Sequence, residues 1–506
     1  GSFREAIHIA NRHAGPDTIL FAIPEGVPGY QADAGIWAIQ PQTELPLITD
    51  GKLLIYAFSQ STFIGRDTNP DGPEIVLDGH QAGQDASGLH LAAPEVSIVG
   101  LTVQRYGNVG IWMDRVAVGH IAGCYIGTDH SGTVAAPNGL GICIGNRCQH
   151  VTVAPMDTFR NVITGNINGG ILVSDTSHAI TLLNNMVGLD RTSQAAPGNG
   201  GFGGLCIQEH CDSVLVFDNR IGGNTCGVLI NNSARNTIQS NWIGISPENL
   251  DLKPGDLIPL TGNKNDGIYI AGESTDNLIS QNIICQNEGP GVGIYGELPI
   301  RNRISQNCIS QNIGSGILYA SAGANMIPAP IITSATGTSV SGTAIPNATI
   351  EFYTDAEDEG QMFQGETRSG SDGHFNWTGV IAGPLPNITA LAINAEGSTS
   401  PFSSAFTTAV EEPPMVSMPS LFSLEQNYPN PFNPETIISY TIPSTSRVRL
   451  TVHDILGQEV AVLVDEVKQP GVYQAIFNGV NCPSGLHFYT LEAGGNIIMR
   501  KMMLLK

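Results

Sequence analysis

The sequence predicts an all-β protein, in which a solenoid of stacked short strands is followed by two small β-sandwich domains. A short unit recurs eight times between residues 101 and 309: an aliphatic run, a polar or small residue, one further residue and another aliphatic. A second recurring unit is a glycine that heads alternating aliphatic residues, as in Gly170-Ile-Leu-Val. Alternation with a period of two residues indicates strands, and recurrence every few tens of residues indicates coils that stack.

The polar position of the first unit is asparagine in six of its eight copies. The carriers in chain order are Leu101, Cys124, Asn166, Asn185, Asn219, Asn241, Asn282 and Asn307. A coil of two or three short strands cannot bury its apolar face alone, so coils stack and each position recurs every ~4.8 Å. An inward asparagine can then hydrogen-bond its copies above and below through its side-chain amide. We therefore expect the asparagines from Asn185 to Asn307 to form one internal ladder.

This pattern resembles the right-handed parallel β-helix proteins of the pectin-lyase-like class, over roughly residues 20 to 325. The resemblance implies a right-handed parallel β-helix, which we place at residues 20–327. Ahead of it, Phe3, Ile7 and Ala10 have the spacing of one helical face, and Gly15-Pro16 ends the run. Residues 1–19 are therefore expected to form a capping helix over the open end of the solenoid.

The repeat pattern of the sequence changes after Met326. Short alternating runs are separated by Gly, Asp and Pro turns at the intervals of a β-sandwich. The run Gly342-Thr-Ala-Ile-Pro-Asn-Ala-Thr-Ile, with Asp372-Gly-His-Phe and Ser400-Pro-Phe-Ser, resembles bacterial immunoglobulin-like modules. We place this domain at residues 328–410 and a Pro-rich linker at residues 411–420.

Residues 421–506 hold the most specific motifs of the chain. They include Tyr428-Pro-Asn-Pro-Phe-Asn-Pro-Glu-Thr, His453-Asp-Ile-Leu-Gly-Gln-Glu-Val and the terminal Lys501-Met-Met-Leu-Leu-Lys. The turns and alternating runs predict a small seven-stranded type of sandwich. In residues and in spacing the segment resembles the C-terminal sorting domain of the type IX secretion system. The resemblance implies the type IX secretion machinery as a partner, and a protein that is secreted or anchored at the cell surface after sorting.

Composition narrows the classes of partner. The chain has 22 Lys and Arg against 45 Asp and Glu, a formal charge of −23, which disfavours nucleic acid and anionic membranes. The chain has no run of eighteen apolar residues, so the sequence predicts no membrane span. The nine cysteines include the spacings Cys143 with Cys148 and Cys206 with Cys211, without the matching cluster that a zinc site needs. We expect no metal and no cofactor. Some cysteines could form bridges in an oxidising space, but buried positions are the preferred interpretation for most of them.

Three long intervals in the repeat place extra residues after one corner of the coil. Two of these loops begin at Asp129 and Asp190, and the third follows Ser246. Because they leave the same corner, they protrude on one flank of the solenoid. One interpretation is that they wall a groove. The favoured interpretation is that they are decorative loops whose aspartates cap their own turns.

A polar column is expected just past the glycine-headed strands. Its members lie five residues after the glycine and are Arg115, Asn146, Asp175, Glu209 and Asn232. The next position adds three charged or titratable residues, Arg147, His210 and Glu273. Aromatic residues take outward strand positions at Trp112 and Tyr269, with Tyr295 expected to join them. Flat rings stack on the C–H faces of sugars while carboxylates and guanidinium groups bind hydroxyls. The expected substrate-binding residues are therefore Trp112, Arg115, Arg147, Tyr269 and Tyr295.

Asp175 and Glu209 occupy equivalent positions on successive coils, about one rung of ~4.8 Å apart. Two carboxylates this close raise one pKa, so one can act as an acid while the other stays ionised. The spacing is near the ~5 to 5.5 Å of retaining glycosidases. Asp175, Glu209 and His210 are thus the candidate catalytic residues. The favoured alternative is a solvated column of turn residues.

The motifs leave two classes of function open. The calcium-binding aspartate cluster of pectate lyases and the full motif set of polygalacturonases are absent, and Asp78-Gly-His80 is only a fragment of the latter. One class is a secreted enzyme that cleaves an extracellular polysaccharide, a glycoside hydrolase or a polysaccharide lyase. The other is a non-catalytic adhesin or glycan-binding structural protein. The missing motifs favour the adhesin, while the loops and the Asp175/Glu209 pair favour the enzyme.

Overall fold

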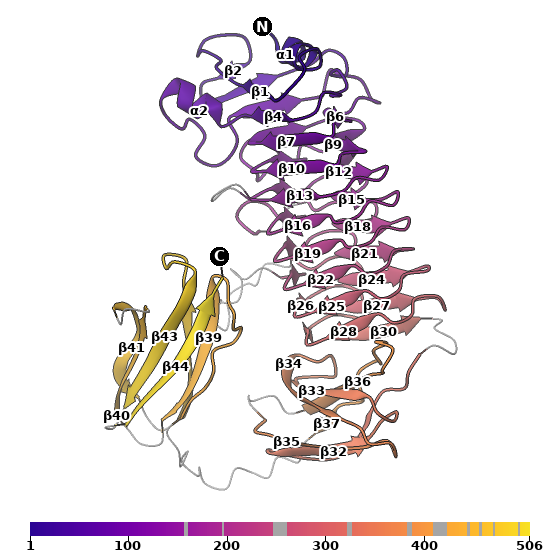
Figure 1. Ribbon diagram of the computed structural model, residues 1–506, viewed down its shortest axis with the longest axis vertical. Helices are drawn as coiled ribbons and strands as arrows, with labels where there is room; N and C mark the ends of the chain where they lie inside the picture. The colour runs from indigo at the N-terminus through magenta and orange to yellow at the C-terminus, as the bar shows by residue number, and fades with distance from the viewer. Residues whose placement is uncertain are drawn as a thin grey trace. The chain divides into compact units, whose positions relative to one another are not determined.

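The computed structural model describes residues 1–155, 160–194, 197–245, 261–320, 326–381, 387–407, 423–442, 446–454, 458–468, 471–493 and 496–505. They divide into two compact units, residues 1–408 and 409–506. The first unit is a β-helix whose coils stack in chain order from the N-terminal end, as Figure 1 shows, followed by a small antiparallel domain.

Three sheets form the walls of the β-helix. Every pairing in them is parallel except that of β2 with β3, as expected when each coil contributes one strand to each sheet. Sheet A consists of β1 (Asp17–Leu20), β4 (Leu53–Tyr56), β7 (Glu95–Val99), β10 (Val118–Ala122), β13 (Val151–Ala154), β16 (Thr181–Leu183), β19 (Leu215–Phe217), β22 (Thr237–Gln239), β25 (Leu278–Ser280) and β28 (Arg303–Ser305). Sheet B consists of β2 (Tyr30–Gln31), β3 (Ile36–Ile39), β5 (Ile75–Asp78), β8 (Leu101–Gln104), β11 (Tyr125–Ile126), β14 (Val162–Ile163), β17 (Met186–Val187), β20 (Arg220–Ile221), β23 (Trp242–Ile243), β26 (Ile283–Cys285) and β29 (Cys308–Ser310). Sheet C consists of β6 (Leu89–Leu91), β9 (Val109–Asp114), β12 (Leu140–Gly145), β15 (Ile171–Val173), β18 (Leu205–Gln208), β21 (Val228–Asn231), β24 (Ile268–Ala271), β27 (Val292–Tyr295) and β30 (Ile317–Ala320).

The predicted asparagine ladder is present inside the β-helix. The side-chain amide of Asn185 donates to Asn219 at 2.9 Å, and the same bond links each later member through Asn241 and Asn282 to Asn307. All five asparagines are buried. The ladder therefore satisfies amide groups that a core of isoleucine and valine would otherwise leave without partners.

Asn166 does not share the position of this ladder, although the repeat pattern aligned it with Asn185 and the later carriers. Asn161, 37 residues after Cys124 and 24 before Asn185, fills the position and donates to Asn185 at 2.8 Å. Asn166 belongs to a second ladder at the next corner, whose members are Asn138, Asn166, Asn199, Asn224, Asn263, Asn287 and Asn312. Coils without a loop carry both asparagines five residues apart, as in Asn161 and Asn166. The long loops are insertions between the two ladder positions.

The N-terminal segment lies over the first coil. Helix α1 (Phe3–Ala10) begins at Ser2, whose hydroxyl accepts from the backbone N–H of Glu5 at 3.2 Å and so caps the helix. Its buried residues Phe3, Ile7 and Ala10 join the core of the β-helix. A second short helix, α2 (Ser59–Ile64), follows β4.

The other end of the β-helix is covered by a small antiparallel domain. One of its sheets is formed by β31 (Ile331–Thr336), β32 (Ser339–Thr343) and β35 (His374–Thr378); the other is formed by β33 (Thr349–Asp355), β34 (Met362–Arg368), β36 (Asn387–Ile393) and β37 (Phe406–Thr407). Tyr353, Leu391 and Ile393 pack into the core of the β-helix, while Phe352 and Phe375 belong to the domain's own core. The buried Glu351 accepts from Ser305 Oγ at 2.5 Å.

The second unit is another antiparallel sandwich with its own apolar core. Its sheets are β38 (Ser423–Leu424), β39 (Glu435–Ile442) and β42 (Gly471–Asn478), and β40 (Ser446–His453), β41 (Glu459–Lys468), β43 (Gly485–Ala493) and β44 (Asn496–Leu504). The described residues of this unit form seven strands, the number that the turn pattern predicts. All-β architecture is thus confirmed for the β-helix and for both small domains.

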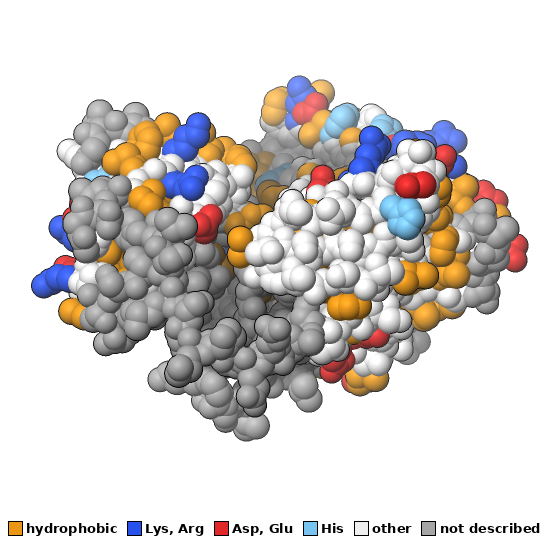
Figure 2. Space-filling view, turned by 90° about the horizontal axis from the view of Figure 1, so that it is seen from below, with side chains coloured by type: hydrophobic (Ala, Val, Ile, Leu, Met, Phe, Trp, Pro, Cys, Tyr) orange, Lys and Arg blue, Asp and Glu red, His pale blue; other side chains and the backbone are white. Residues whose placement is uncertain are grey.

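Exposed large hydrophobic side chains are scattered along the described residues, among them Ile9, Ile167, Ile313 and Val380. In Figure 2 uncharged polar side chains and backbone dominate the face in view, and charged side chains lie in small groups. Within the described ranges no helix is long and apolar enough to cross a bilayer. All nine cysteines are free thiols, and seven of them are buried, which agrees with the preferred interpretation that most are packing residues.

Candidate functional site

The outer face of sheet C carries the aromatic residues that the sequence singled out. Register places Trp112 and Tyr269 in one outward column along the axis of the β-helix. Between them lie Cys143, Leu172, Cys206 and Leu229. Five strand-to-strand steps of about 4.8 Å separate the two rings by ~24 Å. The aromatic floor is therefore two separate platforms joined by small apolar side chains.

The first platform is a stack of His90 and Trp112. Their ring centroids are 4.2 Å apart and the ring planes differ by 2°. Burial lowers the pKa of His90, although Asp114 opposes this effect, so the imidazole is held in its neutral form. Asp114 itself accepts from the Asn146 amide at 3.0 Å and pairs with Arg115 Nε at 3.2 Å. Arg115 thus acts on this platform through Asp114.

The second platform is a stack of Tyr269 and Tyr295, with centroids 4.3 Å apart and planes inclined by 16°. Tyr295 lies two residues beyond Gly293, the register partner of Tyr269. A side chain at Gly293 would collide with the ring of Tyr295, so the glycine makes room for the stack. The Tyr295 hydroxyl donates to Asp266 Oδ2 at 2.8 Å. Burial raises the pKa of the Asp266 carboxyl.

The stretch between the platforms is apolar and chemically inert. Burial raises the pKa of Cys143 and of Cys206 to about 12, so both thiols stay protonated at neutral pH. Leu172 and Leu229 are partly exposed beside them. This column offers contact area to a ligand and no nucleophile.

The candidate acids lie at the edge of sheet C, on the turn toward sheet A. Asp175 and Glu209 share a left-handed backbone with φ of 55° and 57°, as do Arg115 and Asn146 in the same column. A hydrogen bond with Asp175, then burial, raises the pKa of Glu209, while His210 opposes the shift. The nearby Asp175 therefore favours the protonated form of Glu209. Both side chains are exposed.

Arg147 lies on the turn before this pair, and His210 directly follows Glu209. The backbone N–H of Arg147 donates to Asp175 O at 2.9 Å, and that of His210 donates to Asn232 O at 2.7 Å. Both side chains are exposed. The structure thus brings Asp175, Glu209, Arg147 and His210 to one edge, whereas Tyr269 and Tyr295 lie farther along the axis.

The first two long loops, which the structure describes, do not wall the outer face of sheet C. They pack against sheet B, where Gly132 of the first loop lies against the ring of Tyr125, and Arg191 of the second pairs with Asp71 at 2.7 Å. Asp129 Oδ1 accepts from Ser131 Oγ at 2.6 Å, and Asp190 makes the equivalent bonds within its own turn. These aspartates cap turns, as the favoured interpretation expected. Most of the third loop, residues 246–260, lies outside the described residues.

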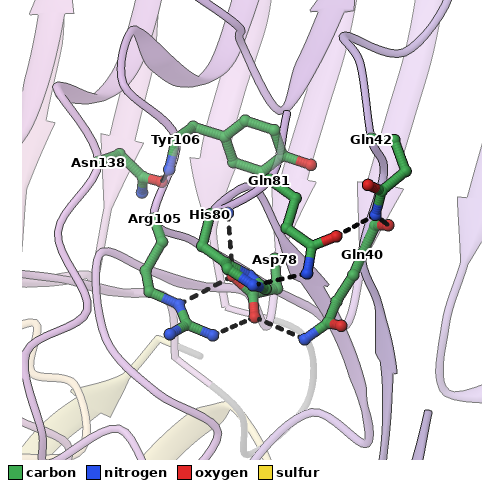
Figure 3. Close-up of polar contacts among 8 residues, drawn as sticks. All are labelled: Gln40, Gln42, Asp78, His80, Gln81, Arg105, Tyr106 and Asn138. Atoms are coloured by element: carbon green, nitrogen blue, oxygen red, sulfur yellow. Dashed lines mark hydrogen bonds and ion pairs between the residues drawn. The ribbon is translucent and has the colours of Figure 1, made fainter. Parts of the chain in front are cut away.

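Asp78 and His80, a fragment of a catalytic motif in sequence, form part of a polar brace. Figure 3 shows Arg105, His80 and Gln40 converging on the buried Asp78. Arg105 Nε donates to Oδ1 at 2.8 Å, and His80 Nδ1 lies 3.2 Å from the same oxygen. Burial alone would raise the pKa of Asp78, but the bonds from Arg105 and the His80 backbone hold it below its usual value. Its carboxylate is therefore committed to tying neighbouring coils together.

Sequence reasoning missed His90 and Asp266. Neither follows a glycine-headed strand at the counted offset, so the counting could not find them. A usable signal exists for His90, because it pairs with Trp112 once β6 is recognised as a further coil. No comparable signal exists for Asp266, whose role depends on the side-chain rotation of Tyr295. Among the described residues, no three His, Cys, Asp or Glu side chains are grouped to hold a metal ion.

Three family models match separate parts of the chain. A right-handed β-helix region matches residues 260–328, and a model of the periplasmic copper-binding protein NosD matches residues 123–258. A secretion-system C-terminal sorting domain matches residues 426–505. The protein is a right-handed parallel β-helix protein with a type IX sorting domain. It is therefore a secreted or cell-surface protein that engages the type IX secretion machinery.

Solved structures of similar shape are distant from this chain. A double mutant of the periplasmic alginate epimerase AlgG is 14% identical with a TM-score of 0.33, covering 60% of this chain and 71% of that one. The A-module of the Azotobacter vinelandii mannuronan C-5 epimerase AlgE4 is 13% identical with a TM-score of 0.36, covering 61% and 73%. The Dettilon tailspike protein is 11% identical with a TM-score of 0.31, covering 94% and 72%. No curated protein matches in sequence.

Proposed function

We propose that the protein binds an extracellular polysaccharide along the outer face of sheet C. The observation that carries the proposal is the pair of stacked aromatic platforms, His90/Trp112 and Tyr269/Tyr295, at two ends of one outward column. Partly exposed rings at solvent-facing positions keep apolar area in contact with water, and such area marks binding sites. The C–H faces of pyranose rings cover that area, beside the mostly buried carboxylates of Asp114 and Asp266.

The spacing of the platforms predicts the form of the ligand. An extended glycan laid along the column reaches both platforms only if it spans ~24 Å. Contacts at two places on one chain reinforce each other, because the second contact is intramolecular. We therefore expect a polymer to bind more tightly than a short oligosaccharide of the same sugar.

The test compares Trp112→Ala, Tyr269→Ala and the double variant in binding to a panel of plant and algal polysaccharides. Each single change should weaken binding to the same polymer, and the double variant should weaken it further. Phe217→Ala is the matched control, because Phe217 is an outward aromatic on sheet A. Binding that is unchanged in the double variant, or equally weakened by Phe217→Ala, would overturn the proposal.

A second candidate function is cleavage of the bound polysaccharide at Asp175 and Glu209, as a glycoside hydrolase or a polysaccharide lyase. The observation that favours it is the raised pKa of Glu209, whose first cause is its interaction with the neighbouring Asp175. His210 stands beside them as a third titratable group. Asp175→Asn and Glu209→Gln should then each lower turnover by orders of magnitude. Because exposed substitutions usually change stability by within about 0.5 kcal/mol, the melting temperature should stay nearly unchanged. Retained turnover in both variants would rule out cleavage at these residues, and binding would remain as the proposed function.

A further inference from the structure

We infer that the polysaccharide bound on sheet C is uncharged, and that polymers bearing a carboxylate or sulfate on each repeat are disfavoured there. The inference rests on the proposed function and adds the chemical class of the ligand. It follows from the charges that surround the two platforms and the edge between them.

The first platform presents no free positive charge to a ligand. The imidazole of His90 is neutral, because burial lowers its pKa. The guanidinium of Arg115 is engaged by Asp114, with Nε 3.2 Å from Oδ1. Asp114 is the charged group nearest the ring stack, with its Oδ2 3.8 Å from His90 Nε2. A carboxylate carried by the ligand would meet the acceptor oxygens of Asp114 here, and the guanidinium of Arg115 is already engaged by that carboxylate.

The second platform is more acidic. Asp266 lies under the stack and its Oδ2 accepts from the Tyr295 hydroxyl at 2.8 Å. Across residues 261–300 a single basic residue, Lys264, stands against five carboxylates, which are those of Asp266, Glu273, Asp276, Glu288 and Glu297. Of these, Asp276 is balanced by Arg301 from the next coil, at 2.7 Å. Acidic side chains therefore outnumber basic ones in the segment that carries the tyrosines.

Along the edge of sheet C between the platforms, basic side chains are likewise outnumbered or paired. Asp175 and Glu209 are exposed and interact with each other, and Arg147 lies on the adjacent turn, where its backbone N–H donates to Asp175 O. Arg235, farther along this edge, is paired with Asp212 at 3.0 Å. Recognition of carboxylate or sulfate groups relies on arginine forks and lysine charges. Here such groups are outnumbered or already paired, whereas hydroxyls of an uncharged sugar find carboxylate acceptors.

The experiment measures binding of the full chain to three pairs of polymers that share a backbone and differ in charge. The pairs are polygalacturonate and its fully methyl-esterified form, carboxymethyl- and hydroxyethylcellulose, and a sulfated galactan and its desulfated form. In each pair that binds, the uncharged member should bind at least about tenfold more tightly at low ionic strength. Its dissociation constant should change little when salt is added, since no ion pairs form.

Two variants test whether the carboxylates cause the preference. Asp114→Asn and Asp266→Asn keep the shape of each side chain and remove its charge. Each variant should therefore bring the dissociation constants of the charged and uncharged members of a pair closer together. Tighter binding of the charged member, including binding that appears only with added calcium, would overturn the inference. The proposed function would still stand in that case if Trp112→Ala and Tyr269→Ala weaken binding. A chain that binds none of the six polymers rejects the proposed function and the inference with it.

Discussion

Glu359 completes the second asparagine ladder by accepting two hydrogen bonds from Asn312. Its Oε2 accepts from the backbone N–H and from the side-chain amide of Asn312, each at 3.1 Å. Asn287 makes the same two bonds to Asn312 Oδ1, at 3.1 and 2.8 Å. A carboxylate from the domain that follows the β-helix thus occupies the position of the next asparagine and closes the last coil.

Glu359→Gln should change how stability depends on pH. Burial raises the pKa of Glu359 to about 7 from an ordinary value of 4.5. A raised pKa means that the fold prefers the protonated acid, so this stabilisation is complete below pH 4.5 and is lost as the pH rises through about 7. Glutamine keeps an acceptor for Asn312 without the charge. Melting temperatures of the parent should fall relative to those of Glu359→Gln between pH 5 and 8. Parallel curves for the two proteins would contradict this prediction.

Breaking the first ladder should weaken the coils on both sides. In Asn241→Ala the backbone N–H and the amide of Asn219 lose the acceptor that they reach at 2.9 and 3.0 Å. Each buried donor without a partner costs roughly 1–3 kcal/mol. Hydrogen exchange at the amide of Asn219 should accelerate and the denaturation midpoint should fall. The same substitution at the exposed Asn168 is the control and should change neither.

The Asp175/Glu209 pair predicts titration shifts of opposite sign. Asp175→Asn removes the neighbouring charge and supplies an amide donor, so the pKa of Glu209 should fall toward its ordinary value. His210→Ala removes a group that lowers the same pKa, so it should rise further. NMR titration of the Glu209 side chain measures both. Equal pKa values in the parent and in Asp175→Asn would show that the two acids do not interact in solution.

Export should depend on the second unit. Deleting residues 421–506 removes the sorting domain that matches over residues 426–505, while the β-helix keeps the covering domain at its end. In a host with the type IX machinery, the truncated protein should accumulate folded in the periplasm, and the full chain should reach the medium or the cell surface. Cell fractionation with an antibody to the β-helix distinguishes these locations. Unchanged secretion of the truncated protein would argue against the sorting role.

Much of the architecture was readable from the repeat because a stacked coil must show its register in sequence. Period-two alternation after a glycine predicts strands, and recurrence of Asn185, Asn219 and Asn241 predicts a ladder, since an unpaired amide in a narrow apolar core is costly. The misplacement of Asn166 arose because each coil has two asparagine corners, and the pattern was read as one. The spacing of Asn161 and Asn166, repeated on other coils, carries that information.

The sequence by itself determined the strands, the stacking and which residues point outward, because these depend on local alternation and on equivalent positions in successive coils. Only the tertiary structure decided which side chains meet across coils. The ring of Tyr295 turns back onto Tyr269 over Gly293, the first long loop folds onto Tyr125 of sheet B, and Glu359 reaches Asn312 from another domain. These contacts depend on side-chain rotation and on the space that neighbours leave, and neither follows a repeat.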